Sequence, residues 1–206
     1  MSILPIYLYG SDVLRQKARP VEALTNDTIK LIYDMMETMH KAGGIGLAAT
    51  QVGSMKRVIV IDITHAEEDQ ESDAGESATV SEEPKGPTRL VLINPEVIEE
   101  SGSWQMEEGC LSIPDVRADV TRAERVTIRF RNANFEEETL DAKGLLGRVV
   151  LHEIDHLEGV LFVDHLTSTK RGLLSPKLRK IKKGDTEATY PVVVASEAKK
   201  SGKVEV

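Results

Sequence analysis

Cysteine, aromatic residues and long apolar runs are all scarce in this chain of 206 residues, and each scarcity excludes a class of structure. Cys110 is the only cysteine, which rules out an intramolecular disulfide and is typical of a reducing compartment. Aromatic residues make up 4% of the chain, so the core must be mainly aliphatic. The apolar runs fall far short of the roughly 18 residues that a membrane-spanning helix needs. We therefore expect a cytoplasmic protein with one main domain and no membrane segment.

The formal net charge of −8 is concentrated in one segment. Residues 65–87 contain eight acids, one base and almost no apolar side chains, so we interpret them as a solvated acidic loop inserted between two strands. Residues 170–183 contain seven bases and no acid. Nucleic-acid binding is one interpretation of this basic segment, but an amphipathic helix with a solvated basic face is favoured. Its apolar residues at helical spacing are Leu173, Leu174, Leu178 and Ile181.

The order of the expected elements indicates the fold class. Helices are expected from Thr25 or Asn26 to about Lys41 and from about Ala142 to Leu157, and the apolar face of the first is predicted as Ile29, Ile32, Met36 and Met39. The expected strands are 56–63, 89–99 and 126–131, with a weaker signal at 190–194. Because the strands do not alternate regularly with helices, the pattern favours an α+β fold. Residues 1–184 are predicted to form the domain and residues 185–206 a C-terminal tail.

The strongest chemical signal is the HExxH sequence of residues 152–156. His152 and His156 are four residues apart, so on a helix both imidazoles lie on one face and can reach a single metal ion. Glu153 lies beside the first histidine, where it can reach a metal-bound water. The apolar residues 149–151 just before the motif indicate a buried helix rather than a surface one. The pattern predicts a metal site.

A catalytic zinc-type site needs a third protein ligand and one position open to water. Cys110 is one candidate, because it follows a glycine in the polar segment EEGCLSIP of residues 107–114. Other candidates lie near or beyond the HExxH motif, and these are Glu158, Asp164, His165 and Glu187. At this point the residues leave the choice open.

The glycine-rich segment GGIGLAATQ spans residues 43–51. It superficially matches a dinucleotide-binding fingerprint, but that loop must follow a strand and open a helix, whereas this segment follows a helix. Glycines also allow a backbone to approach a ligand closely. The amide of Gln51 would suit a narrow site that needs a hydrogen-bond donor.

The segments GGIGLAATQ, EEGCLSIP and HEIDHLEG, in this order, resemble the three signature motifs of peptide deformylase. The resemblance covers roughly residues 1–180, and it implies an α+β fold in which small sheets surround the helix that carries the two histidines. The metal ligands that it implies are Cys110, His152 and His156. The catalytic groups that it implies are the Glu153 carboxylate, the Gln51 amide and the Leu111 backbone N–H. Gly46 and Arg117 correspond to positions that line or hold the peptide.

The resemblance implies a metallohydrolase that removes the N-terminal formyl group from formyl-methionyl nascent polypeptides and releases formate. It favours Fe²⁺, with Zn²⁺ and Ni²⁺ as alternatives, and the basic segment is a candidate ribosome contact. The family usually has glutamine where this chain has Leu151. The main alternative function is a zincin-like metallo-endopeptidase that takes its third ligand from Glu158, Asp164 or Glu187. A structural metal module without catalysis is a second alternative.

Overall fold

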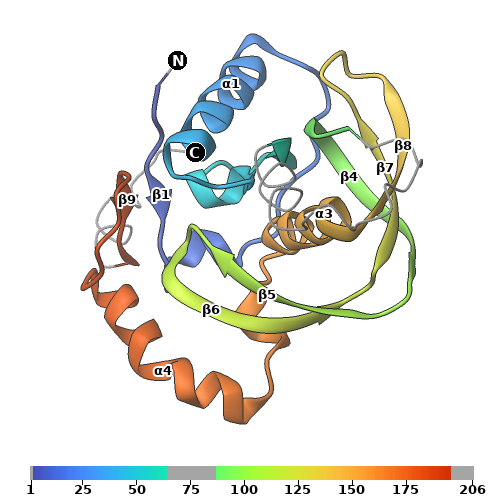
Figure 1. Cartoon of the computed structure of the whole chain (residues 1–206). Coiled ribbons are helices and arrows are strands. Elements are labelled where there is room, and N and C mark those ends of the chain that lie inside the picture. Colours follow the sequence, from blue (N-terminus) through green and yellow to red (C-terminus); the bar gives the residue numbers. More distant parts are fainter. Residues whose placement is uncertain (1, 65–86, 196–206) are drawn as a thin grey trace, which may run out of the picture.

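The computed structural model describes residues 2–64 and 87–195 (Figure 1). The predicted acidic loop lies outside the described residues except for Pro87, and so does the predicted tail from residue 196 onward. Among the described helices, none has the length and apolar character needed to cross a bilayer. The structure is an α+β fold, as expected.

The largest sheet has five antiparallel strands. Their order across the sheet is β2 (Gly46–Ala48), β3 (Val58–Asp62), β4 (Arg89–Ser101), β7 (Arg125–Arg131) and β8 (Glu137–Lys143). Strand β3 is buried along its whole length. Ile59 and Ile61 pack on one face of the sheet, and Val58 and Val60 pack on the other, because side chains alternate along a strand.

Helix α3 (Gly144–Leu157) carries the HExxH motif and packs against the Ile59 and Ile61 face of the sheet. It lies at the centre of the molecule in Figure 1, enclosed by strands. Leu151 is part of this apolar core rather than of the solvent-exposed surface. The helix ends at Leu157, and Gly159 just beyond it has a φ of 76°, a left-handed conformation that favours glycine. The prediction of a buried helix over this region is confirmed.

Helix α1 (Asn26–Lys41) packs on the other face of the sheet. Thr25 caps it by accepting a hydrogen bond from the Thr28 N–H, so the expected bounds are confirmed. The predicted apolar face was wrong in its detail. The side chains packed in the core are Ile32, Met35 and Met39, whereas Ile29 is exposed and Met36 is half-buried. The buried face of the helix is therefore rotated about the helix axis by part of a turn relative to the predicted face.

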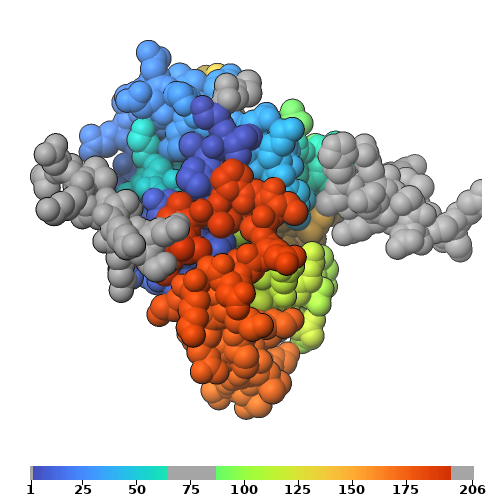
Figure 2. All heavy atoms as spheres, turned by 90° about the vertical axis from the view of Figure 1, so that its left-hand side faces the viewer, coloured from blue at the N-terminus to red at the C-terminus, as the bar shows by residue number. Residues whose placement is uncertain are grey.

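Two smaller sheets complete the fold. Strands β5 (Trp104–Cys110) and β6 (Ile113–Arg122) form an antiparallel hairpin that the sequence analysis did not predict. Strand β1 (Ile6–Tyr7) pairs in parallel with β9 (Val192–Val193), so the segment after residue 184 is packed on the domain as far as it is described. In Figure 2 these red C-terminal residues lie against the dark blue N-terminal ones. The short 3₁₀ helices are η1 (Asp12–Arg15), η2 (Ala49–Val52) and η3 (Phe162–His165).

The basic segment forms most of helix α4 (Ser168–Lys183). Leu178 and Ile181 are buried, and Leu174 is half-buried against the same apolar cluster. Leu173 is 77% exposed, so its place in the predicted apolar stripe was wrong. The amphipathic interpretation therefore holds for the C-terminal half of the helix.

Candidate metal centre and active site

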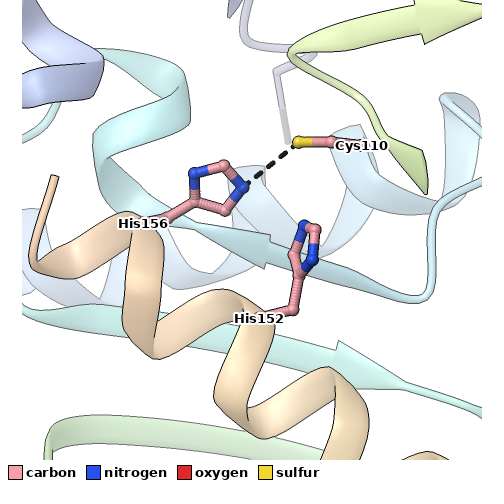
Figure 3. Close-up of side chains that lie close together, drawn as sticks. All are labelled: Cys110, His152 and His156. Carbon is pink, nitrogen blue, oxygen red and sulfur yellow. Dashed lines mark hydrogen bonds between the residues drawn. The ribbon is translucent and has the colours of Figure 1, made fainter. Parts of the chain in front are cut away.

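Three potential metal ligands meet where the end of β5 faces helix α3. The sulfur of Cys110 and the ring nitrogens of His152 and His156 offer ligand atoms that all lie within 4.8 Å of one another. Figure 3 shows the thiol and both imidazoles pointing toward one another, with the Cys110 Sγ 3.1 Å from the His156 Nε2. A thiolate and two imidazoles form a donor set that suits Zn²⁺ or Fe²⁺, so these residues fit a divalent metal.

The other candidate third ligands do not belong to this cluster. Glu158 pairs with Lys17 at 2.6 Å and with Arg57 at 2.6 Å. Asp164 pairs with Arg15, and His165 lies 2.7 Å from Asp155. Glu187 is in the wall of the neighbouring cleft and is not one of the clustered donors. Among the described residues, Cys110 is therefore the third donor that accompanies the two histidines.

The buried carboxylate of Glu108 holds the first histidine from behind. Its Oε2 lies 2.9 Å from the His152 Nδ1, which leaves Nε2 as the ring nitrogen available to the cluster. Glu108 also accepts hydrogen bonds from Arg122 at 2.7 Å and from Arg148 at 2.9 Å. Burial alone would raise the pKa of Glu108, but the hydrogen bonds from His152 and Arg122 hold that pKa well below its ordinary range.

Glu108 was not among the site residues predicted from the sequence. The sequence held one signal that could have identified Glu108 as a site residue. This acid lies two residues before Cys110 on the same strand, β5. Its burial could not be expected from the sequence, since acids are almost never fully buried unless they are paired. The pairing comes from Arg122 and Arg148, which lie on other elements.

Glu153 is buried beside the donor cluster. Its Oε2 has no hydrogen-bond partner among the described residues, so one carboxylate oxygen is available to a ligand. Burial raises the pKa of Glu153 to about 7, against the opposing influence of the positive charges of His152 and Arg122. A carboxyl group with a pKa near neutrality is suited to accepting and returning a proton.

Gly46 lets strand β2 come close to this carboxylate. A Cβ atom at position 46 would lie 2.6 Å from the Glu153 Oε1 and 2.8 Å from the Val149 Cγ1, both closer than van der Waals contact allows. The absence of a side chain at this position is therefore a requirement of the site.

The amide of Gln51 has a fixed orientation. Its Oε1 accepts a hydrogen bond from the Ala48 N–H at 2.8 Å, so its Nε2 must point the other way. That nitrogen lies 3.5 Å from the Cys110 Sγ and 3.3 Å from the Ser112 Oγ. The side chain thus presents N–H donors to the donor cluster, in agreement with the donor that the sequence suggested.

A cleft of about 870 Å³ opens over these groups. Seven of the eight predicted site residues are among those that line it, and these are Gly46, Gln51, Cys110, Leu111, Arg117, His152 and Glu153. The eighth, His156, is 1% exposed and lies beneath the cleft next to Cys110. Arg117 is exposed at the cleft, with its guanidinium 3.9 Å from the Glu107 carboxylate. The structure therefore brings the predicted residues together at one place.

Comparison with known proteins decides the family. A family model described as polypeptide deformylase matches residues 3–172 of this chain. The chain belongs to the polypeptide deformylase family. A peptide deformylase of Salinibacter ruber is 50% identical over 192 residues, which cover 93% of this chain and 94% of the relative. A peptide deformylase of Christiangramia forsetii is 43% identical over 189 residues, covering 91% of this chain and 94% of that deformylase.

Solved deformylase structures share the fold. The crystal structure of a peptide deformylase from Legionella pneumophila matches with a TM-score of 0.73 and 36% identity, over 88% of this chain and 96% of that one. The peptide deformylase of Ehrlichia chaffeensis matches with a TM-score of 0.76 and 33% identity, over 89% and 99% of the respective chains. As a deformylase the protein is a metal-dependent hydrolase, and these matches favour this activity over a zincin-like endopeptidase.

Proposed function

We propose that this deformylase hydrolyses the formyl amide at the N-terminus of formyl-methionyl polypeptides and releases formate. The observation that carries the proposal is the cluster of Cys110, His152 and His156 at the base of an open cleft. Beside it lies a carboxylate oxygen of Glu153 that no other described residue hydrogen-bonds. A cleft of this size accepts the end of an extended polypeptide, and the buried groups at its base can act on the first residue.

The proposed metal ligands are Cys110, His152 and His156. A divalent metal held by these donors would supply Lewis acidity and activate water for attack on the amide. We propose Fe²⁺ as the physiological metal, with Zn²⁺ and Ni²⁺ as alternatives that the same donors accept. Glu108 supports this assignment, because a carboxylate that holds the outer nitrogen of a histidine fixes the ring and raises its basicity.

We propose that Glu153 moves the protons of the reaction. Its burial and its pKa of about 7 allow the carboxylate to accept a proton from the attacking water at neutral pH. The same oxygen can then donate that proton to the amine that leaves when the formyl C–N bond breaks. The oxygen that has no hydrogen-bond partner within residues 2–64 and 87–195 can perform both steps.

We propose that two N–H donors stabilise the negative charge that develops on the formyl oxygen. The Gln51 Nε2 is one, since the hydrogen bond to the Ala48 N–H aims it at the donor cluster. The Leu111 backbone N–H is the other, because this residue directly follows the cysteine and lines the cleft. Donors placed in advance around a developing oxyanion contribute about 2.7–4 kcal/mol each to lowering the barrier.

We propose that the rest of the substrate is held along the cleft walls. Gly46 supplies a wall without a side chain, and the exposed guanidinium of Arg117 can hydrogen-bond to peptide carbonyl groups. Residues 1–184 are proposed as the catalytic domain, with residues 65–87 as an insertion and residues 185–206 as a C-terminal segment.

The proposed setting is the cytoplasm, close to the ribosome. A thiolate ligand needs a reducing compartment, and nascent polypeptides are available there. Helix α4 carries the seven bases of the basic segment, which can contact the phosphates of ribosomal RNA. Co-sedimentation with ribosomes at increasing salt, repeated for the double charge reversal Lys180→Glu with Lys183→Glu, tests this contact. Retention that neither salt nor the reversal reduces would contradict it.

A formate-release assay tests the proposed activity. Protein purified under anaerobic conditions with Fe²⁺ should release formate from formyl-Met-Ala-Ser and should leave acetyl-Met-Ala-Ser and internal peptide bonds intact. Cys110→Ala should lose metal and activity together, whereas Ser103→Ala, in the turn before β5, should change neither. Absence of formate release from the metallated protein, or cleavage of internal bonds, would contradict the proposal. A Cys110→Ala protein that keeps its metal would contradict the ligand assignment.

A further inference from the structure

The turn between β5 and β6 is held by contacts from outside the hairpin. This turn contains Leu111 and Ser112 and directly follows Cys110. The Tyr190 hydroxyl donates a hydrogen bond to the Leu111 carbonyl oxygen at 2.7 Å. The Tyr9 backbone N–H donates to the Ser112 carbonyl oxygen at 2.8 Å. Both carbonyl groups of the turn are thus fixed by residues far away in the sequence.

The sheet of β1 and β9 places Tyr190 and Tyr9 in these positions. The two strands pair in parallel with Ile6 opposite Val192, and the Ile6 N–H donates to the Pro191 carbonyl at 2.9 Å. Pro191 directly follows the tyrosine, so this pairing fixes the backbone from which the Tyr190 ring reaches the turn. Figure 2 shows the C-terminal residues of this sheet lying against the N-terminal ones. The segment after helix α4 therefore forms part of the wall of the cleft.

We propose that Tyr190 is a positioning residue for deformylation, acting through the peptide groups of Leu111. The inference rests on the proposed function, in which the Leu111 N–H stabilises the oxyanion. The carbonyl and the N–H of Leu111 share one Cα, so an anchored carbonyl limits rotation of the residue and keeps its N–H directed at one place. The Tyr190 ring is half-buried against the core and lines the cleft. The hydroxyl is therefore the group whose removal tests the role.

The expected effect is smaller than the loss of an oxyanion donor. Removing such a donor outright lowers kcat by about 10²–10³-fold. Tyr190→Phe leaves the Leu111 N–H in place and removes only its anchor, so we expect kcat to fall by about 5- to 30-fold, a fraction of that loss. KM should change by less than about twofold, because the substitution removes a contact with the enzyme's own backbone and none that the proposal assigns to substrate.

The test compares Tyr190→Phe with Tyr33→Phe in the full-length metallated protein. Tyr33 lies on α1 with 55% of its surface exposed, so its variant loses the same hydroxyl away from the cleft. Formate release gives kcat and KM, and hydrogen exchange followed by mass spectrometry reports on the amides of residues 110–113. We expect faster exchange in this peptide and a lower kcat for Tyr190→Phe only, with equal metal content in both variants.

Each other outcome would overturn the inference. An unchanged kcat would show that the hydroxyl does not position the turn for catalysis. A rise in KM alone would make Tyr190 a substrate-binding residue, and faster exchange throughout the protein would make its role purely structural. A wild-type protein that releases no formate would instead overturn the proposed function, so the two failures are distinguishable.

Discussion

The close approach of β2 to the Glu153 carboxylate makes Gly46→Ala a sharp test of the proposed catalytic geometry. The new methyl group would lie 2.6 Å from the Glu153 Oε1, roughly 0.8 Å short of ordinary van der Waals contact. It would also lie 2.8 Å from the Val149 Cγ1. Val149 is packed in the core of α3 and resists displacement, whereas the carboxylate is the end of a longer side chain. Glu153 is therefore the group that must move.

The size of this movement sets the expected loss of activity. A misplacement of about 1 Å of a reacting group can cost on the order of 10²-fold in rate. A shift of roughly 0.8 Å should therefore lower kcat by about 30- to 100-fold. The atoms nearest to the new methyl group belong to Glu153 and Val149 and not to the proposed metal ligands Cys110, His152 and His156, so metal content should stay unchanged. Overpacking a tight core should lower the free energy of unfolding by about 1–3 kcal/mol.

The assay measures formate release, metal per chain and thermal unfolding for Gly46→Ala and for a matched control. Gly172→Ala is the control, since a Cβ at this helical position meets, among the described residues, no atom within 4 Å beyond its chain neighbours and its own helix backbone. Its kcat should be unchanged and its stability should rise by about 0.5–1 kcal/mol. A Gly46→Ala enzyme with normal kcat would refute the argument that Glu153 needs its observed position. Loss of metal would show that the substitution disturbs the ligands as well.

Three further predictions concern Glu153, Glu108 and Asp62. Glu153→Ala should keep its metal, because the proposed ligands remain, but its kcat should fall by about 10²–10⁴-fold, because the group that transfers the proton is lost. A metal-free variant would contradict this prediction. Glu108→Gln should weaken metal binding by about 10–100-fold, measured by competition with a chelator, and an unchanged affinity would contradict the support assigned to this carboxylate. Asp62 is largely buried, which raises its pKa, but hydrogen bonds from Thr64 and Arg89 hold that pKa below its ordinary range. Its contribution to stability should be complete above about pH 4 and should be lost as the pH falls further. Urea unfolding of Asp62→Asn across this range should show a weaker acid dependence than the wild type, and identical slopes would contradict the prediction.

The features that were predictable from the sequence are those that depend on neighbours along the chain. The spacing of His152 and His156 places both rings on one helix face in any α-helix, because the helical repeat is a local property. The capping of α1 by Thr25 and the continuous apolar run of β3 are equally local. The proposed roles of Glu153 and Gln51 came from the resemblance of their segments to family motifs, and these motifs are also short runs of neighbouring residues.

Contacts between segments that are far apart in the sequence could not be predicted from local sequence patterns. The β5–β6 hairpin was missed, since its acids, glycine and proline have low strand propensity and only mutual pairing holds them extended. Glu108 was not predicted as a site residue, yet it lies against His152, 44 residues along the chain. Tyr190 reaches Leu111 across 79 residues. The separation of two residues along the chain does not determine the distance between them in space, because that distance depends on how sheets and helices pack. Tertiary packing alone brings the Cys110 thiol beside two imidazoles that lie on another element.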